Sequence, residues 1–244
     1  MTADALARSF ESIGDDYDRY RPGFPDEAAQ IIVPVRVATA LDLGAGTGKF
    51  TILLVDRADR VIAVEPSRPM LDVLRARSPR AEALIGSAER IPVPDGAVDV
   101  VTVAQAFHWF DREAASAEIA RILVPGGVLG LLWNRSDPSC AWDRASHRIA
   151  HPAVGDSDGT TDSATELPGF VPVSREQVRW TETLTREHYL RRWTTISSFL
   201  VAEASERARM TAEIEAVLDA DPDTRGRAEL VLPQVTDVFV YRRA

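Results

Sequence analysis

The chain has 244 residues, enough for one large α/β domain or two small ones, and its 45% hydrophobic and 27% charged residues are usual for a globular protein. Its formal net charge of −9 disfavours nucleic acid as the main ligand, because phosphate binding needs a concentrated basic face. Because Cys140 is the single cysteine, an intrachain disulfide is excluded. No stretch is long and apolar enough to span a bilayer, so we expect a cytoplasmic protein without a membrane partner.

Apolar runs of strand length alternate with helical patterns along the chain. The expected strands span 37–43, 60–64, 81–85, 98–103, 127–133 and, near the C-terminus, 234–242. The expected helices span 49–58, 67–77, 112–123, 142–149 and 203–218. This alternation predicts an α/β fold with a doubly wound, mostly parallel sheet and helices on both faces.

The pattern changes character after Trp133. Residues 134–170 hold turn formers and polar residues and look too irregular to extend the sheet. We expect a single domain over 1–244, with a cofactor-binding core at 30–135. Residues 134–200 are then an insertion and cap that shape the site of a second substrate.

The most informative segment is the glycine-rich turn that follows the first strand. Three glycines on alternate positions permit positive φ and let the backbone approach a ligand where a Cβ would clash. The helix after the turn would point its free N–H groups at that ligand. The turn consists of Gly44, Ala45, Gly46, Thr47 and Gly48.

Three kinds of ligand loop share features with this turn. A phosphate loop fails at its first glycine, which would be Leu43, and at its hydroxyl position, which would be Phe50. A dinucleotide fingerprint would place its third glycine at Lys49 and the acid Asp42 near a pyrophosphate, which weakens an NAD site without excluding it. S-adenosylmethionine has no phosphate and carries a sulfonium and an ammonium group, so Asp42 favours it by charge complementarity. An ordinary glycine turn without a ligand is the remaining alternative.

Two further positions follow predicted strands at their ligand-facing ends. Glu65 lies 17 residues after Gly48, where its carboxylate can accept both hydroxyls of a ribose, although the same acid would suit NAD and a strand-end acid is often only solvated. His108 follows the strand 98–103 and could remove a proton from an acceptor, or could only shape the pocket with Trp109. We favour the second role, because Trp109 and Phe110 stand beside His108 as a packed wall.

Other clusters carry weaker signals. Tyr20 and Arg21 precede the first strand and could fold over the cofactor as a lid, Arg21 pairing with a carboxylate. His147 and His151 have a spacing that can ligate a metal on a helix, with Cys140 nearby. Pro152 stands beside His151 and no carboxylate-rich motif accompanies the pair, so we expect no metal site.

Taken together, these motifs resemble those of the class I, Rossmann-like S-adenosylmethionine-dependent methyltransferases. The likeness covers about 30–135 and is carried in order by the segments 41–48, 61–67 with Met70, 86–92 with 107–110, and 123–127. Within that family, 17–25 and 105–110 resemble a small-molecule subgroup that includes the trans-aconitate enzymes. Ser87 stands where the family often has an Asp bonded to the adenine amino group, and it is a weaker acceptor because it lacks charge.

The resemblance implies a seven-stranded sheet with an antiparallel C-terminal strand, S-adenosylmethionine as cofactor, and methyl transfer to a small-molecule acceptor. An NAD-dependent oxidoreductase and a non-catalytic module that senses S-adenosylmethionine are the alternatives. Neither the acceptor's identity nor the oligomeric state follows from the resemblance. His108 is the candidate catalytic residue, and the cofactor-binding residues that the resemblance implies are Tyr20, Arg21, Asp42, Gly44, Ala45, Gly46, Thr47, Gly48, Glu65, Pro66, Met70, Ser87, Ala88, Glu89, Gln105, Ala106, Phe107 and Trp109.

Overall fold

A computed structural model describes residues 18–151, 164 and 166–244. Seven strands form one sheet in the order β3-β2-β1-β4-β5-β7-β6. Their bounds are β1 Val37–Leu43, β2 Ala58–Glu65, β3 Glu82–Ile85, β4 Val98–Ala104, β5 Leu123–Ser136, β6 Phe170–Thr185 and β7 Glu229–Arg243. The first five strands pair in parallel with their neighbours.

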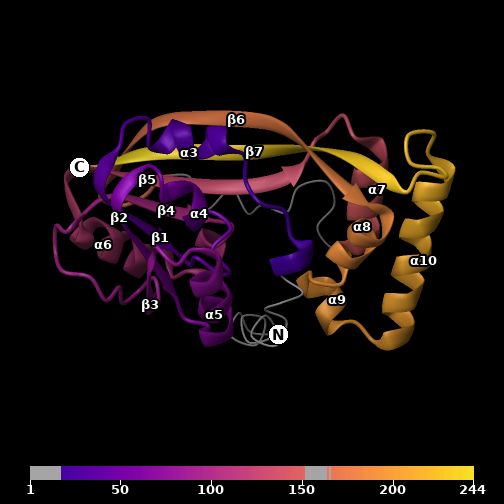
Figure 1. Ribbon diagram of the computed structural model, residues 1–244, viewed down its shortest axis with the longest axis horizontal. Coiled ribbons are helices and arrows are strands. Elements are labelled where there is room, and N and C mark those ends of the chain that lie inside the picture. The colour runs from indigo at the N-terminus through magenta and orange to yellow at the C-terminus, as the bar shows by residue number, and fades with distance from the viewer. Residues whose placement is uncertain (1–17, 152–163, 165) are drawn as a thin grey trace. The chain divides into compact units, whose positions relative to one another are not determined.

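The chain divides into two compact units, which we call the sheet unit and the helical unit. The sheet unit comprises 23–134, the described part of 159–178, and 236–244, and the helical unit comprises the described residues of 1–22, 135–158 and 179–235. Strands β5 and β6 both run from the sheet unit into the helical unit and β7 runs back, so β7 is antiparallel to its neighbours (Figure 1). The expected doubly wound sheet with an antiparallel C-terminal strand is therefore confirmed.

Helices cover both faces of the sheet within the sheet unit. Because side chains alternate along a strand, Leu41 and Leu43 of β1 pack with α6 (Arg112–Ile122), while Ala40 packs with α3 (Asp26–Ile32) on the opposite face. The segment α5 (Arg68–Arg77) forms a smaller core with Ala63 of β2. Each face of the sheet is thus buried, as the near-continuous apolar strands require.

Local sequence signals explain the two helices that the sequence located best. Helix α5 begins after Ser67, whose hydroxyl accepts a hydrogen bond from the Met70 N–H, and it has a proline in its first turn. Helix α6 begins after Asp111, whose carboxylate accepts from the N–H groups of Glu113 and Ala114. Both helices agree with the expected ranges to within one residue at each end.

Two expectations about the regular structure were wrong in extent. The helix expected at 49–58 is one turn, α4 (Thr51–Leu54), because β2 already begins at Ala58, paired with Val37. The stretch after Trp133 does extend the sheet, since β5 continues to Ser136 and β6 begins at Phe170. Strand β6 lies at the sheet edge and most of its residues are exposed, so it lacks the apolar signal of a buried strand.

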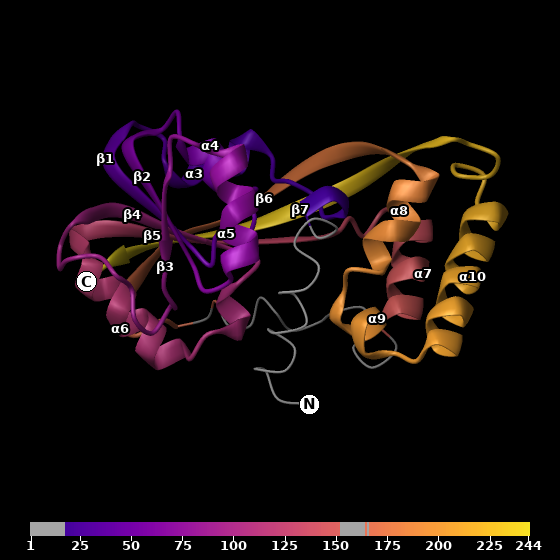
Figure 2. The same ribbon diagram turned by 60° about the horizontal axis from the view of Figure 1, so that its bottom comes forward.

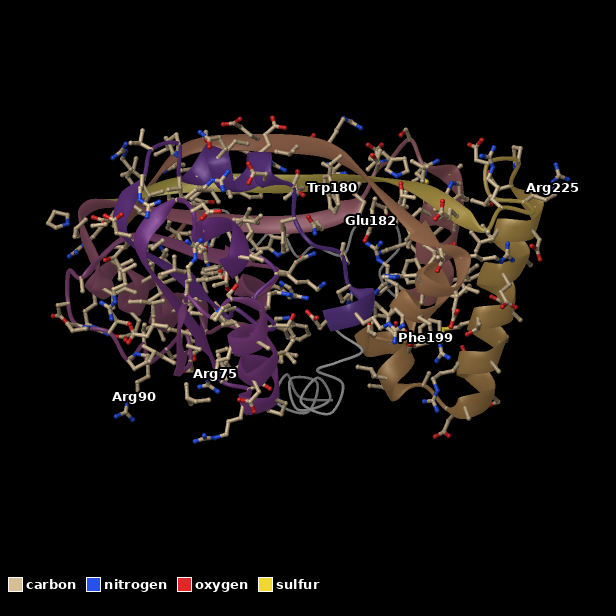
Figure 3. All side chains as sticks on the ribbon, in the orientation of Figure 1. Arg75, Arg90, Trp180, Glu182, Phe199 and Arg225 are labelled. Atoms are coloured by element: carbon tan, nitrogen blue, oxygen red, sulfur yellow. The ribbon has the colours of Figure 1, made fainter. Side chains whose placement is uncertain are left out.

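The helical unit contains α7 (Ala141–Ala150), α8 (Arg186–Trp193), α9 (Ser197–Val201) and α10 (Ala204–Ala220), and α7, α8 and α10 lie side by side (Figures 1 and 2). Its core is rich in aromatic side chains, among them Trp142, Tyr189 and the Phe199 labelled in Figure 3. The Tyr189 hydroxyl donates to Asp143 over 2.7 Å, and burial raises the pKa of Tyr189. Across the described residues, no helix is long and apolar enough to cross a membrane.

Candidate functional site

The glycine-rich loop after β1 is tied to β2 and packed from two sides. The N–H groups of Gly44 and Ala45 both donate to the Val64 carbonyl, over 2.8 and 3.1 Å. Gly44 and Gly48 have φ of +67° and +82°, and a Cβ on them would lie 2.8 Å from the Ala106 Cβ and 2.9 Å from the Leu74 Cγ, respectively. These two glycines are therefore required by the protein's own packing.

Gly46 differs from the other two glycines of the loop. Its φ is +54°, but among the described residues the heavy atom nearest to a Cβ placed there is the Met70 Sδ, at 3.9 Å. Packing within the protein thus leaves room at this position. A side chain on Gly46 would occupy space that a ligand can use, which is the geometry expected where a backbone approaches a bound molecule.

Glu65, at the end of β2, lies directly against this part of the loop. Its Oε2 accepts from the Gly46 N–H and its Oε1 from the Ser67 N–H, each over 3.0 Å. Burial raises the pKa of Glu65, and these two hydrogen bonds oppose the rise. A carboxylate offers about four lone-pair positions, so two hydrogen bonds leave capacity for two hydroxyl donors.

Asp42 lies beneath the loop rather than at its mouth. Its carboxylate is 1% exposed and accepts hydrogen bonds from the Thr51 hydroxyl over 2.7 Å and the Thr102 hydroxyl over 2.9 Å. Burial raises its pKa to about 6, the two threonines oppose that rise, and the charge of Glu65 adds to it. Asp42 thereby joins β1, α4 and β4 under the loop, and its direct contact with a cofactor stays a prediction.

The segment after β3 reaches the same end of the sheet. The Gly86 N–H donates to the Glu65 carbonyl over 3.4 Å, which brings Ser87 near the end of β2. Ala88 is buried in the core beside α6, and the Glu89 carboxylate accepts from the Asp111 N–H over 3.2 Å. This segment is therefore held between the loop region and the start of α6.

The segment after β4 packs against the loop from the other side. Gln105 has φ of +55° and its side-chain amide donates to the Asn134 carbonyl over 3.1 Å. Ala106 and Phe110 lie against Gly44, so the short helix η1 (Phe107–Trp109) starts next to the loop. Phe107 is buried, whereas Trp109 is 40% exposed. Most of the predicted cofactor residues are thus gathered at one end of the sheet.

His108 has a partner that sequence reasoning did not assign to it. The indole Nε1 of Trp133 donates to His108 Nδ1 over 3.2 Å, and Trp133 is buried at the end of β5. From the sequence, Trp133 marked only the end of the strand expected at 127–133. Its place on the strand next to β4 was the available signal, because parallel neighbours end at the same edge of a sheet.

The predicted lid residues belong to the helical unit. Arg21 donates to the Thr195 carbonyl over 3.2 Å, and the ring of Tyr20 packs edge-on against His188 with centroids 5.3 Å apart. Their contact with a cofactor therefore stays a prediction.

The histidine pair of α7 also lies in the helical unit. The rings of His147 and His151 stack at 4.4 Å, with Trp193 edge-on to both. Within the described ranges, no three His, Cys, Asp or Glu side chains are grouped so as to hold a metal ion.

Comparison with known proteins agrees with this arrangement. Residues 41–131 match the family model described as a methyltransferase domain. The chain is 41% identical over 232 residues to an uncharacterized methyltransferase of Mycobacterium tuberculosis (strain ATCC 25618 / H37Rv), covering 95% of this chain and 94% of the relative. It is 40% identical over 90 residues to a malonyl-[acyl-carrier protein] O-methyltransferase of Serratia marcescens, covering 36% of this chain and 35% of the relative. A solved structure of a putative type II methyltransferase from Anaeromyxobacter dehalogenans has a TM-score of 0.70 at 26% identity, covering 92% of this chain and 97% of that one.

Proposed function

The chain belongs to the class I S-adenosylmethionine-dependent methyltransferases, and from that premise we propose that it transfers the methyl group of S-adenosylmethionine to a small-molecule acceptor by in-line displacement. The observation that carries the proposal is the space around Gly46, where a Cβ would meet no close atom of the protein, next to the Glu65 carboxylate. Gly46 supplies a backbone surface without a side chain, and Glu65 supplies acceptors for ribose hydroxyls. The residues present thus suit the cofactor.

The geometry favours S-adenosylmethionine over the rival cofactor NAD. Helix α4 has only four residues, so it provides little of the helix dipole that usually stabilises a pyrophosphate. The carboxylates of Asp42 and Glu65 add negative charge under and beside the loop. A phosphate-free, cationic cofactor is therefore the better electrostatic match.

The reaction asks mainly for alignment of the acceptor with the methyl group. When bound, S-adenosylmethionine would supply a methyl group on a sulfonium: an aligned nucleophile would bond to the methyl carbon as the carbon–sulfur bond breaks and S-adenosylhomocysteine leaves. The protein's part is to hold the acceptor and exclude water, and the half-exposed Trp109 together with His108 is suited to line that position. The O-methyltransferase relative supports an oxygen nucleophile, and the resemblance to the trans-aconitate subgroup supports a small acceptor. We expect the enzyme to act in the cytoplasm without nucleic acid or membrane.

The proposal is tested by incubating the protein with methyl-labelled S-adenosylmethionine and a filtered small-molecule cell extract. We expect label to enter a small molecule with the parent protein and not with Gly46→Val, whose side chain would fill the ligand's space. Gly96→Val is the matched control, because Gly96 also has a positive φ, +58°, and open space around it but lies away from the loop. Labelling by Gly46→Val at the level of Gly96→Val would contradict the proposal, and cofactor binding without any labelled product would favour the sensing module.

A further inference from the structure

The contact between Trp133 and His108 determines where the proton of the histidine ring resides. An indole N–H can only donate, so the Nδ1 of His108, 3.2 Å from the Trp133 Nε1, must act as the acceptor. An accepting ring nitrogen carries no proton. In the neutral imidazole the proton is therefore on Nε2, which is then a hydrogen-bond donor.

The same contact opposes the charged form of His108. An imidazolium carries protons on both nitrogens, so its Nδ1–H would face the Trp133 N–H and two donors would meet. Trp133 cannot turn away easily, because it is 1% exposed and its ring packs edge-on against Phe239 with centroids 5.7 Å apart. The hydrogen bond therefore favours the neutral ring with its proton on Nε2.

We infer that Trp133 is a positioning residue, which holds His108 as a neutral donor through Nε2–H and prevents it from acting as a general base. A general base needs an unprotonated nitrogen directed at the acceptor's proton. In this form the Nε2 can only donate, so to any partner it offers an N–H suited to a lone pair on an oxygen or nitrogen atom. The inference rests on the proposed function only for the identity of the ligand as a methyl acceptor.

The location of His108 makes this tautomer relevant to the site. Ala106 and Phe110, on either side of it in sequence, lie against Gly44 of the glycine-rich loop. His108 thus belongs to a segment that packs at both ends against the glycine-rich loop, and Trp133 holds its ring through Nδ1. His108 in this form does not remove the acceptor's proton.

The tautomer is observable by nitrogen NMR of the whole ¹⁵N-labelled protein, without cofactor or acceptor. Long-range ¹H–¹⁵N correlation separates protonated from unprotonated ring nitrogens, and the His108 signals are identified by their loss in His108→Gln. We expect an unprotonated Nδ1 and a protonated Nε2 near neutral pH. A protonated Nδ1, or two nitrogens averaged by exchange, would overturn the inference.

Removing the indole N–H tests the role of Trp133 itself. Trp133→Phe removes the donor, and incorporation of benzothienylalanine at position 133 removes it while keeping the shape, should the phenylalanine variant fail to fold. In either protein we expect the two His108 nitrogens to move toward an averaged pair. An unchanged spectrum would assign the tautomer to another contact and refute the positioning role. Because neither measurement uses cofactor or acceptor, failure here is distinct from failure of the proposed function.

Discussion

Replacing Asp42 with Asn should change the pH dependence of stability in a direction that the structure fixes. Asp42 is buried with two threonine hydroxyls as its partners, and burial raises its pKa from 3.8 to about 6. Asn has the same shape and cannot ionise, and either threonine hydroxyl can rotate to accept from its amide. The substitution thus removes the charge with little change in packing.

The sign follows from proton linkage. A carboxyl whose pKa is raised by folding favours the folded state fully only below its unfolded value of 3.8, and that stability is lost as the pH rises through about 6. A shift of roughly 2 pKa units corresponds to about 3 kcal/mol, which is therefore the expected penalty of the ionised group in the protein without cofactor at pH 8. The Asn variant lacks that penalty because its side chain does not ionise.

The assay is urea denaturation of parent and variant at a series of pH values from 4 to 8. The free energy of unfolding of Asp42→Asn minus that of the parent should increase with pH, by up to about 3 kcal/mol across the series. Titrating groups other than Glu65, whose charge acts on Asp42, cancel in the difference because both proteins share them. A difference that does not change with pH would refute the claim that Asp42 titrates as a buried acid.

Three further predictions test other contacts. S-adenosylhomocysteine that lacks the ribose 2′-hydroxyl should bind the parent more weakly by about 1.5–3 kcal/mol, as for a lost charge-assisted hydrogen bond. In Glu65→Gln the same omission should weaken binding much less, and equal losses in calorimetry would mean that Glu65 only holds the loop. His108→Gln, which keeps an N–H donor, should retain turnover within about tenfold, and His108→Ala should lose more. Loss of a general base would instead reduce the turnover of both variants by roughly 10²–10⁴. Tyr189→Phe should lower the free energy of unfolding by about 1–3 kcal/mol because it removes a hydrogen-bond donor from the buried Asp143. An unchanged urea midpoint would show that this hydrogen bond does not stabilise the fold.

The glycine-rich loop and the acid after β2 could be predicted because their signals are local. An apolar strand followed by alternating glycines forces a turn with positive φ, and Glu65 ends the next apolar strand in the chain. Helices α5 and α6 were equally accessible, since each carries its own cap and apolar face. These features depend on few residues that are close in sequence.

The remaining features depend on residues that only the fold brings together. The hydrogen bond from Thr102 to Asp42 needs β4 to lie beside β1 in one register, and the bond from Trp133 to His108 needs β5 to lie beside β4. Strand β6 was not predicted because an exposed, charged edge strand has no apolar alternation. The order and register of strands are long-range properties that a local pattern does not encode.

The central claim, that the Gly46 and Glu65 face binds S-adenosylmethionine, is tested most directly by titration calorimetry of the parent protein with S-adenosylhomocysteine and, separately, with NAD. We expect a saturable isotherm with one S-adenosylhomocysteine per chain and no binding of NAD at the same concentrations. Binding of NAD without binding of S-adenosylhomocysteine would contradict it.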